Sequence, residues 1–438
     1  MRTTDEQSHH EQGHVDRPAV CIVHHSYYPQ HGHMRRDAET LTRHGYDVTV
    51  IALHRDGQPR QERLNGVHVY RLPLTHERGS LWRYALEYAR LMGLTFVTLT
   101  RLHWRKRFRV IEIDNMPDAL VFSALVPKLM GAKVILYIFD NMPELMMVAR
   151  GKSARHPLVR LLALQERVSA AFADRVIVTQ ETARQLASER GIPNEKVTVV
   201  LNGPDETIFT PRRLQEHPGT RTGASDTFEI VTHGTILERF GIQILIQALP
   251  RIIEQVPNVR VTVFGEGEYR PALEDLARTT GVADRVCFGG WVPLEQLPSV
   301  LSRFDLGYVG MLCNNMLSNK LMEYVAVGLP IVAARWPTYQ HYFDDDSVAY
   351  FEAGSSDSLA AAIIGVYRDR PSALRRAARA AHRFVRYSWS AQRHIYCALY
   401  ETLTGSARLH PETASAVRPH VRRTESTPAP ALPAAQPV

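Results

Sequence analysis

One tetrapeptide, Asp-Asn-Met-Pro, occurs twice in this chain, beginning at Asp114 and again at Asp140, each time directly after an apolar run. Carboxylate and amide side chains of this kind can hydrogen-bond a polar ligand if the two turns face one cleft. The alternative is structural, because Asp and Asn close turns on their own backbone, and Pro117 and Pro143 fix φ at the start of a following helix. The tetrapeptides alone leave both interpretations open.

Short β-branched runs alternate with longer amphipathic segments along most of the chain. This alternation is typical of βα units around a parallel sheet, so we expect an α/β fold. The expected strands are residues 19–23, 47–51, 68–72, 109–113, 133–137, 175–178 and 197–200, followed by 228–232, 259–264, 285–290, 306–310, 330–334 and 348–351. Ligands bind outside the carboxyl ends of such strands, and both tetrapeptides lie there.

The length of 438 residues exceeds what one hydrophobic core sustains. We therefore expect two domains, residues 18–210 and 228–386. Residues 211–227 break the pattern with Pro, Gly and charge and are predicted to form the linker. Residues 1–17 and the Pro-rich residues 405–438 lack the apolar content needed for folding, and we expect both to be disordered.

The chain has no apolar stretch of the roughly 18 residues that cross a bilayer, and its first residues lack the apolar centre of a signal peptide. We therefore expect a cytoplasmic protein. The four cysteines, Cys21, Cys287, Cys313 and Cys397, are far apart and do not have zinc-ligand spacing. Neither a disulfide nor a metal site is expected.

The net charge of +7 is unevenly distributed, because residues 101–109 are dense in Arg and Lys and follow an apolar segment. A basic stretch beside an apolar helix is able to rest on an anionic membrane surface or to attract another polyanion. A solvated helix end is the alternative. Nucleic acid is disfavoured as a partner, because no nucleic-acid-binding module accompanies the charge.

Five further stretches together carry a family resemblance. They are residues 34–51, 199–211 with the segment Asn-Gly-Pro-Asp, 233–249, 263–293 and 318–334. In this order, over residues 18–404, they resemble the retaining GT-B glycosyltransferases of family 4, also called group 1. The resemblance implies two Rossmann-like domains facing a cleft, with a helix at residues 387–404 that crosses back to the first domain.

The resemblance also implies that the second domain holds a nucleotide sugar. Arg239 and Lys320 would face the diphosphate, because a helix start and positive side chains favour an anion. Glu323 would accept hydrogen bonds from the ribose. The residues implied in donor binding are Glu323, Asn315, Asn319, Gly234, Gly265, Gly267, Gly290 and Trp291. Two positions depart from the family pattern, since Asn315 stands in place of an acidic residue and Phe240 in place of a lysine.

In the first domain, the resemblance places Asp140 beside the reacting sugar. Asp140, Arg239 and Lys320 are therefore the candidate catalytic residues. The loop after the first strand and the first tetrapeptide form the expected acceptor side. The residues expected to contact the acceptor are His25, Tyr28, Arg35 and Asp114.

The implied reaction is transfer of a hexose from a nucleoside diphosphate sugar to an acceptor hydroxyl, with retention of the anomeric configuration and without a metal or other cofactor. The expected acceptor is a glycan or lipid-linked molecule of cell-envelope polysaccharide or glycolipid synthesis, met at the inner membrane face. Two alternatives remain. One is a nucleotide-sugar epimerase of the same architecture, and the other is a catalytically degenerate partner of another glycosyltransferase.

Overall fold

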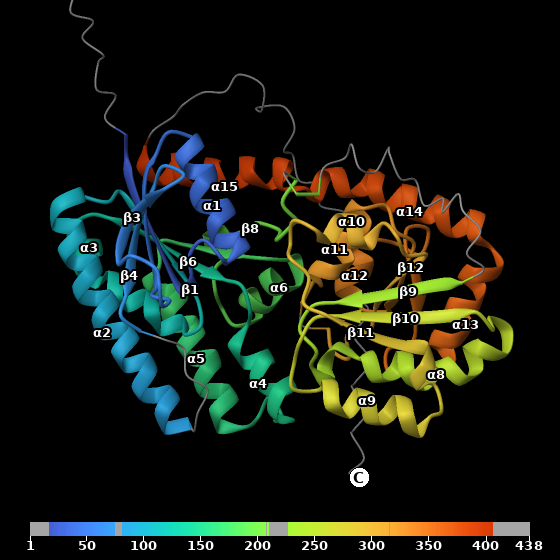
Figure 1. The fold of residues 1–438 in the computed structure, drawn as a ribbon. Helices are drawn as coiled ribbons and strands as arrows, with labels where there is room; N and C mark the ends of the chain where they lie inside the picture. Colours follow the sequence, from blue (N-terminus) through green and yellow to red (C-terminus); the bar gives the residue numbers. More distant parts are fainter. Residues whose placement is uncertain (1–16, 75–80, 207, 210–226, 315, 406–438) are drawn as a thin grey trace, which may run out of the picture.

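The computed structural model describes residues 17–74, 81–206, 208–209, 227–314 and 316–405. The predictions for most of the linker, for the two terminal segments and for Asn315 fall outside these ranges. Two sheets of mainly parallel strands, each covered by helices, lie side by side (Figure 1). The predicted two-domain α/β architecture is confirmed.

The first sheet has eight strands in the order β3-β4-β2-β1-β5-β6-β7-β8. Their bounds are β1 Ala19–Tyr27, β2 Asp47–Leu53, β3 Gln61–Leu64, β4 Val67–Leu72, β5 Val110–Asp114, β6 Lys133–Ile138, β7 Arg175–Val178 and β8 Val197–Val199. Seven of them match predicted runs and pair in parallel. The exception is β3, which pairs antiparallel with β4 at the edge of the sheet.

Helices cover both faces of this sheet. They are α1 Gly32–Arg43, α2 Leu81–Lys106, η1 Asp118–Ala124, α3 Leu125–Leu129, α4 Met142–Arg150, α5 Pro157–Phe172 and α6 Glu181–Glu189, with the short turn η2 Asn194–Lys196. The core on one face contains side chains of α2, η1, α5 and α6. The core on the other contains side chains of α1 and of the last helix of the chain.

The second sheet is parallel throughout, in the order β11-β10-β9-β12-β13-β14. Its strands are β9 Phe228–His233, β10 Val259–Phe264, β11 Val286–Gly290, β12 Leu306–Val309, β13 Ile331–Ala334 and β14 Ala349–Phe351. The surrounding helices are η3 Glu238–Phe240, α8 Ile242–Gln255, α9 Arg270–Thr279, η4 Ala283–Arg285, α10 Leu297–Leu301, α11 Asn319–Ala326, α12 Pro337–Tyr342, α13 Ser356–Arg368, α14 Arg370–Phe384 and η5 Val385–Tyr387.

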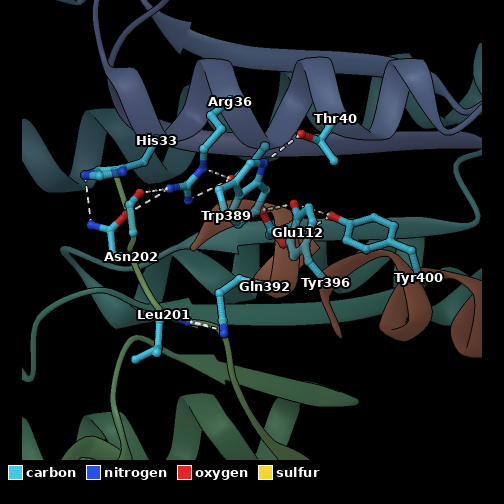
Figure 2. A network of polar contacts seen from close by, with 12 residues as sticks. His33, Arg36, Thr40, Glu112, Leu201, Asn202, Trp389, Gln392, Tyr396 and Tyr400 are labelled. Carbon is cyan, nitrogen blue, oxygen red and sulfur yellow. Dashed lines mark hydrogen bonds and ion pairs between the residues drawn. The ribbon is translucent and has the colours of Figure 1, made fainter. Parts of the chain in front are cut away.

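The last helix, α15 Trp389–Thr404, leaves the second domain and packs on the first (Figure 1). Four of its buried residues, Trp389, Gln392, Tyr396 and Tyr400, are spaced three or four positions apart, as expected of one helical face against a core. Tyr396 and Tyr400 of this face donate hydrogen bonds to the buried carboxyl of Glu112 in β5, at 3.0 and 3.1 Å (Figure 2). The predicted crossing helix is confirmed.

The chain segment after β8 is tied to both α1 and α15 (Figure 2). Arg36 Nη1 donates to Gly203 O at 2.7 Å, and its guanidinium carbon lies 3.7 Å from the ring centroid of Trp389. The backbone N–H of Leu201 donates to Gln392 Oε1 at 2.9 Å. Three segments that are far apart in the sequence therefore meet where the chain leaves the first domain.

Candidate active site

A pocket of about 620 Å³ lies between the two domains. Its first-domain wall comes from the carboxyl-terminal part of β1 and from residues just after β5, β6 and β7. Its second-domain wall comes from the end of β9, from η3 and from the start of α11. The pocket thus occupies the crevice at strand ends where ligands of parallel sheets bind.

The start of α11 forms one wall of this pocket, to which Ser318, Asn319 and Lys320 contribute. Ser318, at the N-cap, makes no side-chain capping hydrogen bond. The first backbone N–H groups of a helix lack partners within the helix, and together with the helix dipole they favour an anion. Asn319 and Lys320, two of the predicted donor-site residues, therefore lie where a phosphate would be stabilised.

Lys320 is buried, Glu323 is partly buried with 14% of its side chain exposed, and both line the pocket. Burial lowers the pKa of Lys320 to about 8, against the opposing effect of Glu323. Burial raises the pKa of Glu323 to about 7, against the opposing effect of Lys320. His233 Nε2 lies 3.2 Å from Glu323 Oε2, but burial lowers the pKa of this histidine to about 3, so the imidazole is uncharged.

Phe240 occupies the wall between two cations. The ring centroid of Phe240 lies 4.6 Å from Lys320 Nζ and 5.1 Å from the guanidinium carbon of Arg239. Cations at such distances from an aromatic face are stabilised by the ring quadrupole. Arg239 itself does not belong to the pocket lining, although its charge opposes the burial that raises the pKa of Asp140. The phenylalanine that departs from the family pattern thus packs against the lysine of α11.

The predicted donor glycines differ in position. Gly234, directly after β9, lines the pocket, whereas Gly265, Gly267 and Gly290 do not. A Cβ added to Gly265 would lie 1.9 Å from Gly234 O, and one added to Gly267 would lie 2.0 Å from Ile236 O. Gly265 and Gly267 are therefore needed for close backbone packing behind the wall. Trp291 is 73% exposed and also lies outside the pocket lining.

The aspartates of the two tetrapeptides occupy different positions relative to the pocket. Asp140 of the second copy lines the pocket, and burial raises its pKa. Asp114 of the first copy is buried behind the wall, where its Oδ2 lies 2.5 Å from Nδ1 of His24. His24 lines the pocket, so Asp114 is positioned to act through this imidazole and not by direct contact with an acceptor.

Asn115 of the first copy holds the second copy in place. Its Nδ2 donates to Asp140 O at 2.6 Å, and its Oδ1 accepts from the backbone N–H of Phe139 at 3.0 Å. Pro143 lies in the first turn of α4, and Pro117 directly precedes η1. The structural interpretation therefore fits Asp114 and Pro117, whereas Asn115 and Met116 of the first copy line the pocket together with Asp140.

Histidines form much of the first-domain wall. The ring centroids of His24 and His31 are 4.3 Å apart, and those of His31 and His33 are 5.5 Å apart. Burial lowers the pKa of His24 to about 4 and that of His31 to about 3, and it lowers the pKa of His33 well below its usual value. These rings are uncharged hydrogen-bonding groups at neutral pH. The prediction missed His31 and His33, although four histidines within residues 24–33 were a visible signal.

Of the expected acceptor residues, His25 lines the pocket. Tyr28 is 0% exposed and packs in the core against the sheet, so its side chain has no access to an acceptor. Arg35 does not belong to the lining either. The loop after β1 turns Tyr28 inward, and sequence reasoning placed it on the cleft wall.

Family models match both halves of the chain. A glycosyl transferase 4-like domain matches residues 30–203. A glycosyl transferases group 1 model matches residues 227–369. The chain belongs to the group 1 glycosyltransferases. The first model covers the first sheet from β2 to β8, the second model covers the second sheet, and most of the pocket wall comes from the two matched regions.

Relatives of this glycosyltransferase include an uncharacterized glycosyltransferase of Methanocaldococcus jannaschii, 25% identical over 69% of the chain and 75% of the relative. A human phosphatidylinositol N-acetylglucosaminyltransferase subunit is 24% identical over 72% of the chain and 62% of its own length. The phosphatidyl-myo-inositol mannosyltransferase of Mycolicibacterium smegmatis is 27% identical over 38% of the chain and 43% of its own length. The match thus spans less than two thirds of the latter two relatives.

Solved structures share the fold. A sucrose-phosphate synthase from Thermosynechococcus elongatus superposes with a TM-score of 0.71 at 17% identity, over 89% of this chain and 100% of that one. The Anabaena protein HepE, in complex with UDP-glucose, superposes with a TM-score of 0.63 at 16% identity, over 87% of this chain and 99% of that one. The GT-B architecture is therefore established for this glycosyltransferase.

Proposed function

We propose that this glycosyltransferase moves a hexose from a nucleoside diphosphate sugar to an acceptor hydroxyl, with retention of the anomeric configuration. The observation that carries the proposal is a pair of ionisable residues on the wall of the interdomain pocket: Lys320, buried in the first turn of α11, and Glu323, partly buried one turn later. Two ionisable groups taken out of water at an anion-favouring helix start are costly unless a ligand compensates them.

In this proposal the diphosphate lies against the first turn of α11 and Lys320, and Glu323 accepts hydrogen bonds from the ribose. Negative charge builds on the diphosphate as the bond to the sugar breaks, and Lys320 with the helix N–H groups stabilises it. Arg239 adds positive charge nearby. These groups supply the positive charge that a metal ion supplies in other enzymes, so the proposed reaction is metal-independent.

The sugar would then extend towards Asp140 and the imidazole of His24, which line the opposite wall. The departing phosphate takes the proton of the acceptor hydroxyl, and the two domains exclude water. Two relatives are named as transferases of N-acetylglucosamine to phosphatidylinositol and of mannose to phosphatidyl-myo-inositol. This supports a glycolipid or lipid-linked glycan of the cell envelope as the proposed acceptor.

The first test is protection against thermal unfolding by nucleoside diphosphates, with UDP, GDP and ADP as probes. A ligand at a hundred times its Kd stabilises the folded state by about 2.7 kcal/mol. We expect protection of the unaltered enzyme and clearly weaker protection of Lys320→Met and Glu323→Gln at the same ligand concentration. The matched controls are Lys152→Met and Glu295→Gln, because both residues are exposed and lie outside the pocket.

The second test is mass spectrometry of the products formed from a nucleotide sugar with and without an acceptor. Acceptor-dependent transfer is the expected result. Conversion of the donor sugar to its epimer without any acceptor would replace the proposal with an epimerase. Absence of protection by all three diphosphates would replace it with a non-catalytic partner of another glycosyltransferase.

A further inference from the structure

Exposed apolar side chains of the described residues are concentrated on three helices of the first domain. Of the large hydrophobic side chains that are exposed, four lie on α2, two on α3 and four on α5, against four elsewhere in the described chain. The most exposed are Leu129 at 80% and Val97 and Trp104 at 62% each. An apolar surface of this extent on one side of a protein indicates an interaction site.

These helices form one continuous layer. Both α2 and α5 pack on η1, and α2 also contacts α3. All of them cover the sheet face opposite α1 and α15 (Figure 1). We call the outward side of α2, α3 and α5 the apolar-basic face.

Basic residues are interleaved with the apolar ones on this face. On α2, the exposed residues Leu86, Arg90, Val97, Arg101 and Trp104 follow each other at spacings of three, four or seven positions, which places them on one helical side. On α5, Leu161, Leu164 and Val168 have the same kind of spacing. Each helix therefore presents a mixed apolar and basic stripe to solvent.

Acidic residues are missing from the exposed part of this region. Within the described residues 86–175, every Asp and Glu is buried or partly buried, whereas many Arg and Lys side chains are exposed. Like charge opposes pairing of this face with a second copy of itself. Aliphatic side chains such as Leu129, Leu161 and Leu164 find no partner on a nucleic acid, whereas they fit the boundary between lipid headgroups and acyl chains.

We propose that the apolar-basic face docks this glycosyltransferase on an anionic lipid bilayer. Val97, Trp104, Leu129, Leu161 and Leu164 insert between headgroups, and the flanking arginines contact the lipid phosphates. The face adjoins the pocket, because Tyr88, two residues after Leu86 on α2, lines the pocket wall. A lipid-linked acceptor held at the surface lies close to the transfer site. This last step rests on the proposed function, and the docking itself does not.

The test is sedimentation of the full chain with vesicles of phosphatidylcholine that contain phosphatidylglycerol, compared with phosphatidylcholine alone, at low salt. We expect the protein to partition to the anionic vesicles only. The apolar variant Val97→Ser/Trp104→Ser/Leu161→Ser and the basic variant Arg101→Gln/Arg105→Gln/Arg160→Gln each weaken partitioning by about tenfold or more. The matched controls Tyr367→Ser/Val385→Ser/Ile395→Ser and Arg260→Gln/Arg303→Gln/Arg375→Gln do not.

Several outcomes overturn the proposal. These are absence of binding by the unaltered protein at low salt, equal binding by the face variants and their controls, preferential retention on nucleic acid, and a dimer that dissociates in the apolar variant. Thermal protection by the nucleoside diphosphate that protects the unaltered enzyme is measured on every variant. Loss of vesicle binding with protection intact separates a failure at this face from a failure of the proposed donor site.

Discussion

Lys320 and Glu323 lie one helical turn apart, and burial moves their pKa values towards each other, to about 8 and about 7. Lys320 is charged at pH values below its pKa, and Glu323 is charged at pH values above its pKa. Both are therefore mainly charged only in the narrow pH range between the two pKa values. A diphosphate favours the protonated lysine, and ribose hydroxyls favour the ionised carboxylate. Donor binding is thereby coupled to the protonation of this pair.

We predict that affinity for a nucleoside diphosphate is highest between pH 7 and 8. Above that range Lys320 loses its proton, and below it Glu323 gains one, so affinity falls by up to about tenfold per pH unit on each side. Isothermal titration calorimetry over a series of buffers measures this profile.

The control for this prediction is Glu323→Gln. This variant should bind the diphosphate more weakly. Its affinity should still fall above pH 8, but it should no longer show the fall centred near pH 7 that protonation of Glu323 causes. A shallower acid fall from the phosphate itself, which titrates near pH 6, stays in both proteins. An affinity that is constant from roughly pH 6.5 to 9.5 in the unaltered enzyme would contradict the coupling.

At the scale of elements, β5 carries two buried carboxyl groups, one directed to the pocket wall and one to the crossing helix. Asp114 at its end contacts His24 in the pocket wall, while Glu112, two residues earlier, accepts hydrogen bonds from Tyr396 and Tyr400 of α15. Burial raises the pKa of both carboxyls well above the usual range. One short strand therefore connects the pocket with the crossing helix.

We predict that Tyr396→Phe/Tyr400→Phe lowers the free energy of unfolding by roughly 2 to 4 kcal/mol, because it leaves a buried carboxyl without its donors. Equilibrium denaturation in urea measures the change. Tyr70→Phe/Tyr367→Phe is the control pair and should shift the unfolding midpoint little. Equal effects of the two pairs would refute a specific role for the Glu112 contacts.

Sequence reasoning located the strands well, because buried parallel strands are nearly continuous apolar runs. Residues 175–178 and 259–264 were predicted with the bounds that the structure shows. It missed β3 Gln61–Leu64, which has one apolar residue, Leu64, and alternates between exposed and partly buried positions at the sheet edge. A pattern that depends on burial cannot identify a strand of this kind.

The pocket was harder to predict than the fold. Lys320, Glu323, Asn319 and Asp140 line its walls, because Asp140 follows a strand and the other three lie in the first turns of a helix that begins at the crevice. Tyr28 was predicted to face the cleft, but it packs in the core. The backbone conformation of the loop after β1 determines this direction, and the sequence does not show it. The burial of Asp114 behind His24 depends on contacts between β1 and β5, which the sequence does not display.

At the scale of the whole molecule, Arg36 connects three parts. It is buried, it donates to Gly203 O where the chain leaves the first domain, and it lies over Trp389 at the start of α15. The neighbouring Asn202 contacts His33, a residue of the pocket wall, with 2.8 Å between Nδ2 and Nε2. The junction between domains and the pocket thus share one set of contacts.

We predict that Arg36→Met loosens this junction without unfolding either domain. A lost hydrogen bond to a charged group is worth roughly 1.5 to 3 kcal/mol, so amide hydrogen exchange at Leu201 and in the first turn of α15 should accelerate about tenfold or more. Hydrogen exchange with mass spectrometry measures it. The exposed Arg63→Met is the control, and exchange rates that match between the two variants would disprove the role of Arg36.

The position of α15 in the first-domain core affects how the protein is made. Trp389, Tyr396 and Tyr400 pack with Val20 and Ile22 of the first strand, yet the ribosome adds them roughly 190 residues after β8 is finished. At about 5 to 20 residues per second, this delay is about 10 to 40 s. During translation the nascent first domain therefore has an uncovered apolar side, which makes it a natural client for chaperones until the last helix emerges.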